Sequence, residues 1–185
     1  MIELKEMVSE FEVLCAAALW LQGLGTIEEV ILSPARRQEI SLVDQKCQLK
    51  EKLLRAGCEK LSFQSNGPDI VARGKSCIWK VECKGLGRGG TSTIDNNFDR
   101  ALSSVVSYYD EPAEEGHTNL STVMNLIANK DKPTRLALAL PVSDRYMSLL
   151  KKCVKPALRR RLDLWLLIVN PLASSVECYN PTRDF

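Results

Sequence analysis

Hydrophobic and polar residues follow one another along the chain with periods that predict helices and strands in a definite order. Apolar side chains recur at helical spacing over 2–22, and two glycines follow, so this stretch predicts a helix. A second helical pattern covers 41–56 and stops at Gly57. The segment between the two helices, through Pro34, shows neither period and is expected to be a loop.

Three short strands are predicted next, joined by turns that contain glycine, serine and asparagine. They cover 59–64, 69–73 and 77–84, the last reading CIWKVECK. A glycine-rich loop over 85–90 then leads to a helix over 94–109. A three-stranded meander between helices is therefore expected.

The C-terminal part alternates helix and strand. We predict a short helix over 120–129, a buried strand over 134–140, a helix over 144–161 kinked at Pro156, a strand over 164–169 and an edge strand over 176–179. This order predicts an α/β fold with a mixed central sheet flanked by helices. The length of 185 residues suits a single domain, 1–185.

Composition narrows the class of protein. With 45% hydrophobic residues, 26% charged residues and a net charge of +2, the chain resembles an ordinary globular protein and not a disordered one. The longest uncharged stretch near the N-terminus, 13–27, is too short to span a membrane, and acidic residues precede it, so no span or secretory leader is expected. Seven cysteines without a CxxC pair, and a single histidine, predict reduced thiols in a cytoplasmic protein without a zinc site.

The residues that suggest chemistry lie in the predicted hairpin 67–85. Side chains alternate along a strand, so Glu82 and Lys84 share one face while Cys83 points to the other. Asp69 begins the partner strand, close to Glu82. Adjacent carboxylates repel unless a cation joins them, and Mg²⁺ or Mn²⁺ prefers oxygen ligands. Asp69, Glu82 and the Cys83 backbone carbonyl are therefore candidate metal ligands, and Lys84 is placed to orient a water or to neutralise charge on a phosphate.

The pattern Pro68-Asp69, then twelve residues, then Glu82-Cys83-Lys84 resembles the motif of the restriction-endonuclease-like, PD-(D/E)XK nuclease superfamily. Among the acid-x-Lys triplets noted in the chain, only this one ends an apolar strand and precedes a turn glycine. The resemblance implies a Mg²⁺-dependent endodeoxyribonuclease, which hydrolyses DNA phosphodiester bonds with Asp69, Glu82 and Lys84 as catalytic residues. The alternative is an exposed hairpin in which Lys84 forms a salt bridge with either acid.

The superfamily core has the order αβββαβ, and the predicted elements over 41–140 follow that order. The resemblance extends over 41–170 and leaves 1–40 as an N-terminal helical extension. Many members place a further acid near the metal from the helix that precedes the meander. The equivalent position here is Asp44 or Gln45, and Glu10 or Glu12 on the first helix is the alternative. Some members also carry a Gln or Tyr on the following helix, where this chain has Arg100, Ser104, Tyr108 and Tyr109.

Several basic residues are candidates for contacts with nucleic-acid phosphates. They are Arg88 in the glycine-rich loop, Arg100 on the next helix, and Lys151, Lys152, Lys155 and Arg159, which helical spacing places on one face. A solvated surface is the alternative for each of them.

DNA is the expected partner. A homodimer or a partner protein is expected as well, because cutting two strands needs two sites and no separate DNA-recognition module is evident. Two other functions compete with the nuclease: a non-catalytic nucleic-acid-binding or assembly subunit that retains the fold, and an α/β interaction protein without a metal. The second of these predicts that removing Glu82 or Asp69 stabilises the fold.

Overall fold

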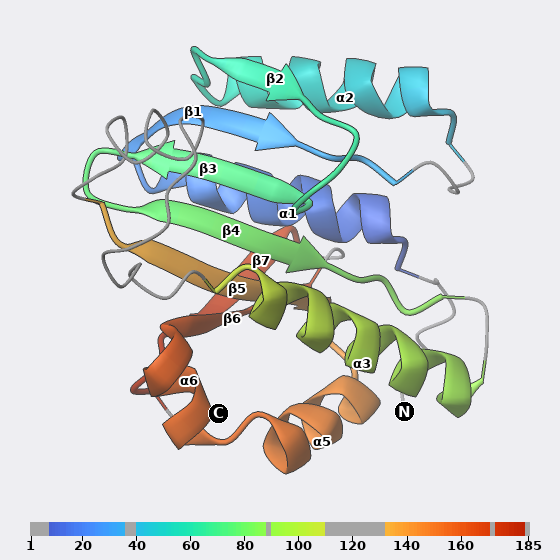
Figure 1. Cartoon of the computed structure of the whole chain (residues 1–185). Coiled ribbons are helices and arrows are strands. Elements are labelled where there is room, and N and C mark those ends of the chain that lie inside the picture. The colour runs from blue at the N-terminus through green and yellow to red at the C-terminus, as the bar shows by residue number, and fades with distance from the viewer. Residues whose placement is uncertain (1–7, 36–39, 88–89, 110–131, 171–172, 184–185) are drawn as a thin grey trace.

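One mixed sheet organises the described residues, which are 8–35, 40–87, 90–109, 132–170 and 173–183 in a computed structural model of the chain (Figure 1). Its strands are β1 (Ile27–Leu32), β2 (Leu61–Phe63), β3 (Ile70–Gly74), β4 (Ile78–Cys83), β5 (Thr134–Pro141), β6 (Leu164–Asn170) and β7 (Ser175–Tyr179). They lie in the order β2-β1-β3-β4-β5-β6-β7. The pairs β1–β2, β4–β5 and β5–β6 are parallel, and β1–β3, β3–β4 and β6–β7 are antiparallel. The predicted mixed sheet, including the edge strand near 176–179, is confirmed.

Helices cover both faces of this sheet, as predicted. The helices α1 (Glu10–Gly23) and α2 (Leu42–Arg55) pack on one face, while α3 (Thr91–Ser107), α5 (Asp144–Cys153) and α6 (Pro156–Leu162) pack on the other. The alternation in β5 serves both layers, because Ala137 and Ala139 face α1 whereas Leu136, Leu138 and Leu140 face α3 and α5. Within the described ranges, no helix is long and apolar enough to cross a membrane.

The segment 27–32 corrects the sequence-based expectation of a loop, because it forms the inner strand β1. Only Val30 and Leu32 are buried in it, which is too few positions to show a period in the sequence. Since β1 lies between β2 and β3, the predicted meander is wrong in its first pairing. The N-terminal helical extension expected over 1–40 also contains this strand, which pairs with β2 and β3.

Pro156 separates two helices where a single kinked helix was expected. Helix α5 ends at Cys153, and α6 begins at Pro156, the first helical position, where the missing backbone N–H is not needed. The interruption changes which basic side chains share a face. The predicted helix over 120–129 lies outside the described residues.

Candidate active site

The hairpin of β3 and β4 brings the three predicted catalytic side chains together. Its register pairs Ile70 with Val81, and continuing it places Asp69 opposite Glu82. Lys84 directly follows β4, and its backbone N–H donates a 3.1 Å hydrogen bond to a carbonyl of β5. These backbone contacts fix the side chains at the C-terminal end of β4, as the alternation along the strand predicts.

The Lys84 ammonium lies among oxygen atoms. Its Nζ is close to the Cys83 carbonyl at 2.9 Å, Glu82 Oε1 at 3.0 Å, Glu10 Oε2 at 3.4 Å and Asp69 Oδ2 at 4.0 Å. The lysine side chain is 14% exposed. One cation therefore faces three carboxylates, so the cluster carries excess negative charge whenever all three are ionised.

Burial and neighbouring charges shift the pKa values of Asp69 and Lys84. Burial and the nearby Glu82 carboxylate raise the pKa of Asp69 to about 7, although Lys84 and the Cys83 backbone N–H, which donates to Asp69 Oδ2 at 2.7 Å, oppose the change. Burial lowers the pKa of Lys84, but the surrounding carboxylates outweigh burial and hold it above its ordinary value. Lys84 therefore stays protonated as long as these carboxylates surround it.

Glu10 reaches the cluster because helix α1 starts in a fixed place. Ser9 and Glu12 form a reciprocal cap, in which the Glu12 backbone N–H donates to Ser9 Oγ and Glu12 Oε2 accepts from Ser9 N and Oγ. The cap leaves Glu10 in the first turn. A Cβ on Gly85 would lie 2.5 Å from Glu10 N, so glycine permits the start of α1 to pass this close to the end of β4.

Two tyrosines from the layer of α3 and α5 form hydrogen bonds in and next to the cluster. The Tyr108 hydroxyl donates to Glu82 Oε2 at 2.9 Å, and burial together with the Glu82 carboxylate raises the pKa of Tyr108. The buried Tyr146 hydroxyl donates to the Gly85 carbonyl at 2.8 Å, and burial raises the pKa of Tyr146 to about 12. Both hydroxyls therefore remain protonated donors. Sequence reasoning placed Tyr108 on the right helix, but it missed Tyr146, because an aromatic residue in an amphipathic helix looks like core packing.

Asp44 and Gln45, the expected sources of a fourth ligand, are occupied elsewhere. Asp44 is exposed at the start of α2, where its backbone N–H and its carboxylate both bond to Ser41 Oγ. Gln45 is buried, and its Nε2 donates to the carbonyls of Ala35 and Ile40 at 3.1 and 2.9 Å. The structure instead places Glu10 beside Lys84, because α1 and not α2 begins over the end of β4.

Arg159 is not available to nucleic acid, which corrects its predicted role. The side chain is fully buried. Its guanidinium donates to backbone carbonyls of Arg183 at 2.8 Å, Tyr179 at 3.0 Å, Asn180, and Leu164 at 3.5 Å. Arg159 therefore ties α6 to the end of β7 and to the C-terminal segment.

The other basic candidates differ in their placement. Lys151 and Lys152 are exposed on α5, Lys155 is exposed just before α6, and Arg100 is exposed on α3. Arg88 lies outside the described residues. The exposed lysines and Arg100 therefore remain available for phosphate contacts.

The donor set around Lys84 suits a hard divalent ion. Among the described residues, no group of three or more His, Cys, Asp and Glu side chains is arranged to hold a metal ion. The oxygens of Asp69, Glu82 and the Cys83 carbonyl instead converge on the Lys84 ammonium. Mg²⁺ often binds through only one or two carboxylates, with water and phosphate as the other ligands, so this smaller set fits it.

Comparisons of the chain with models of protein families, with curated proteins and with solved structures found no match. The function is therefore inferred from the side chains of the site and their chemistry.

Proposed function

We propose that this chain is a metal-dependent nuclease that hydrolyses DNA phosphodiester bonds at the cluster of Asp69, Glu82 and Lys84. The observation that carries the proposal is the convergence of three carboxylates and a backbone carbonyl on one largely buried lysine. Gathering like charges in a buried place destabilises a fold. Such a cluster is useful where a divalent cation and an anionic substrate compensate the charge.

The connectivity of the sheet supports the proposal. If α2 and β2 are set aside as an insertion at the edge, the chain reads α1, β1, β3, β4, α3, β5, with β1, β3 and β4 antiparallel and β5 parallel to β4. This is the αβββαβ order of the restriction-endonuclease-like superfamily. The core helix is then α1, not the helix over 41–56, which accounts for the presence of Glu10 at the site.

Each side chain has a distinct part in the proposed chemistry. Asp69, Glu82 and the Cys83 carbonyl would hold a divalent cation, with Glu10 as an additional carboxylate. Such a cation, when bound, polarises a phosphate oxygen and makes an attacking water more acidic. Lys84 donates hydrogen bonds to that water or to the phosphate, whose negative charge grows during attack. Tyr108 holds the second oxygen of Glu82 and so fixes the orientation of this carboxylate.

The surface made by α3 and α5 supplies candidate contacts to the DNA backbone. Arg145 on α5 forms an ion pair with Asp95 on α3, with Nε 2.7 Å from Oδ1, so the two helices are joined. Lys151, Lys152 and Arg100 are exposed on these helices. Such residues provide affinity that does not depend on sequence, which predicts strongly salt-dependent binding.

A cleavage assay tests the proposal. Supercoiled plasmid, linear duplex, single-stranded, flap and four-way-junction DNA, and RNA, are incubated with the protein in Mg²⁺ and in Mn²⁺. Lys84→Met and Glu82→Gln are run in parallel, with Lys60→Met as a control at an exposed lysine that directly precedes β2. We expect metal-dependent cleavage that both site variants lose and the control keeps. Cleavage that survives in Lys84→Met contradicts the proposal, and DNA binding without cleavage favours a non-catalytic binding subunit.

A further inference from the structure

Helix α1 is unusual for a helix at the surface because its outer side is apolar. Its inner side is buried in the core through residues such as Val13 and Leu21. Ala16, Leu19 and Trp20 border the core and are only partly buried, and the Trp20 ring packs edge-on against buried Trp79. Surface helices normally present polar residues to water, and apolar groups left partly exposed indicate a binding surface.

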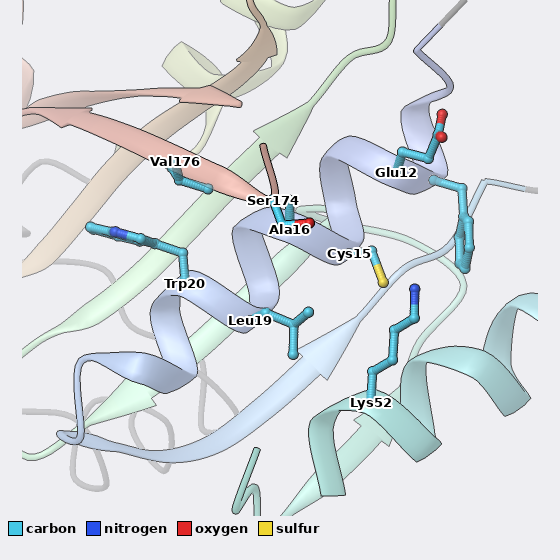
Figure 2. Close-up of a pocket in the computed structure, with 9 residues that line it drawn as sticks. Glu12, Cys15, Ala16, Leu19, Trp20, Lys52, Ser174 and Val176 are labelled. Atoms are coloured by element: carbon cyan, nitrogen blue, oxygen red, sulfur yellow. The ribbon is translucent and has the colours of Figure 1, made fainter. Parts of the chain in front are cut away.

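A pocket of about 430 Å³ lies along this side of α1 (Figure 2). Ala16, Leu19 and Trp20 contribute from α1, Lys52 contributes from α2, and Val176 contributes from β7. The pocket is therefore bounded by three separate elements of the fold. Its volume falls in the range that accommodates a small organic ligand.

The two ends of the pocket differ in polarity. Figure 2 shows Lys52, Cys15 and Glu12 gathered at one end, with Trp20 and Val176 at the other. Lys52 lies close enough to Cys15 to lower the pKa of its thiol, but burial outweighs this effect and raises the pKa, so the thiol carries no opposing charge. No carboxylate of the described residues forms an ion pair with Lys52.

The carboxylate at this end is already engaged. Glu12 Oε2 accepts hydrogen bonds from the backbone N–H and the hydroxyl of Ser9, each at 2.7 Å. The hydroxyl of Ser174 adds a further donor to the pocket wall. Lys52 is therefore the charged donor at the polar end, whereas hydrocarbon and an indole ring form the other end.

We propose that this pocket binds a small amphipathic anion, with its carboxylate at Lys52 and its hydrocarbon body along Leu19, Trp20 and Val176. A second copy of the chain fits less well. A symmetric dimer needs a self-complementary surface, and two recessed faces cannot fill one another. The pocket lies beside α1, between α2 and β7, and its lining does not include Asp69, Glu82 or Lys84, so the proposal does not depend on nuclease activity.

Calorimetric titration with decanoate, decanol and decylammonium tests the proposal. The three probes share one hydrocarbon chain and differ in head-group charge. We expect saturable binding of decanoate that exceeds the binding of decylammonium. Because a hydrogen bond to a charged group contributes substantially to binding, Lys52→Met should weaken the binding of decanoate about tenfold or more. It should leave the binding of decanol unchanged. Lys50→Met, at an exposed lysine on the same helix, is the matched control and should change nothing.

A second variant tests the apolar part of the site. Ala16→Phe fills the pocket from α1 and should abolish binding of decanoate and decanol alike, while circular dichroism and the melting temperature verify that the variant is folded. Equal binding of decanoate and decylammonium, or unchanged decanoate binding in Lys52→Met, overturns the assignment of an anion. The absence of saturable binding by any of the three probes overturns the site itself.

Discussion

Lys84 is a largely buried and Arg159 a fully buried basic side chain, and the sequence suggests contact with phosphate for each. Lys84 is 14% exposed and lies among three carboxylates. Arg159 is fully buried and donates hydrogen bonds to the backbone carbonyls of Leu164, Tyr179, Asn180 and Arg183. The two residues differ in the chemistry of what surrounds them and not in their own charge.

The carboxylates around Lys84 can take part in chemistry, whereas the carbonyls around Arg159 serve to hold the structure together. Carbonyl oxygens cannot change their charge, and those around Arg159 are fixed by the end of β7 and the C-terminal segment. Carboxylates can take up protons or exchange one cation for another. In the proposed function, Lys84 therefore stands where another cation would bind, whereas Arg159 holds two segments together. Substitutions at the two positions should therefore have different consequences.

Lys84→Met should lower cleavage about 10²- to 10³-fold, because it removes a cation that faces charge developing on the phosphate. Rates are compared under single-turnover conditions, where product release does not limit them. The variant also leaves its carboxylates without a cation, so it should be more stable at pH 5 than at pH 8 in EDTA. A variant with normal cleavage would remove Lys84 from the chemistry.

Arg159→Met should reduce the free energy of unfolding by about 3 kcal/mol or more, because several buried carbonyls lose their donor at once. Urea unfolding measures the loss, and Arg159→Lys should recover part of it. At a temperature where the variant is folded, its affinity for DNA should match the wild type. A loss of DNA affinity without a loss of stability would restore the phosphate-binding role.

Asp69→Asn should change the pH dependence of stability. An acid whose pKa is higher in the folded than in the unfolded chain lowers the free energy of unfolding as pH rises between the two values. For Asp69 these values are 3.8 and about 7, so wild-type stability in EDTA should fall across this window. Asp69→Asn should flatten the decline and be the more stable protein at pH 8. If the variant were less stable there, burial and repulsion would not be the cause of the raised pKa.

Tyr146→Phe should cost about 1–3 kcal/mol of unfolding free energy, because the buried Gly85 carbonyl loses its donor. Tyr108→Phe removes a partly exposed hydroxyl and should cost less stability, but it frees one oxygen of Glu82. Thermal unfolding and cleavage measured on both variants compare the two tyrosines. Equal stability losses would indicate that Gly85 finds another partner.

The hairpin and the strands around it were predictable, because their side chains alternate in the sequence and a glycine turn follows Lys84. The inner strand β1 was not, since only Val30 and Leu32 of its six residues are buried. Without β1, the core was assigned to begin at the helix over 41–56. That single omission also put Asp44 and Gln45 ahead of the alternative Glu10, which is the acid that lies beside Lys84.

Other parts of the site depend on contacts distant in sequence. The pattern Ser9-x-x-Glu12 signals a helix start, which would have favoured Glu10 as a first-turn acid, but only packing shows that this turn meets Gly85. Burial of Arg159 depends on a C-terminal segment that no local period relates to α6. Sequence spacing alone therefore could not tell the buried arginine from its exposed lysine neighbours.

A titration with Mn²⁺ tests whether the cluster around Lys84 binds a divalent metal ion. Electron paramagnetic resonance reports free Mn²⁺ during a titration of the wild-type protein, of Asp69→Asn and Glu82→Gln, and of the control Asp44→Asn. We predict saturable binding that both site variants weaken and the control retains, and that Mg²⁺ displaces. If Mn²⁺ did not bind, or bound equally well to all four proteins, the cluster around Lys84 would not be a metal site and the nuclease proposal would fail with it.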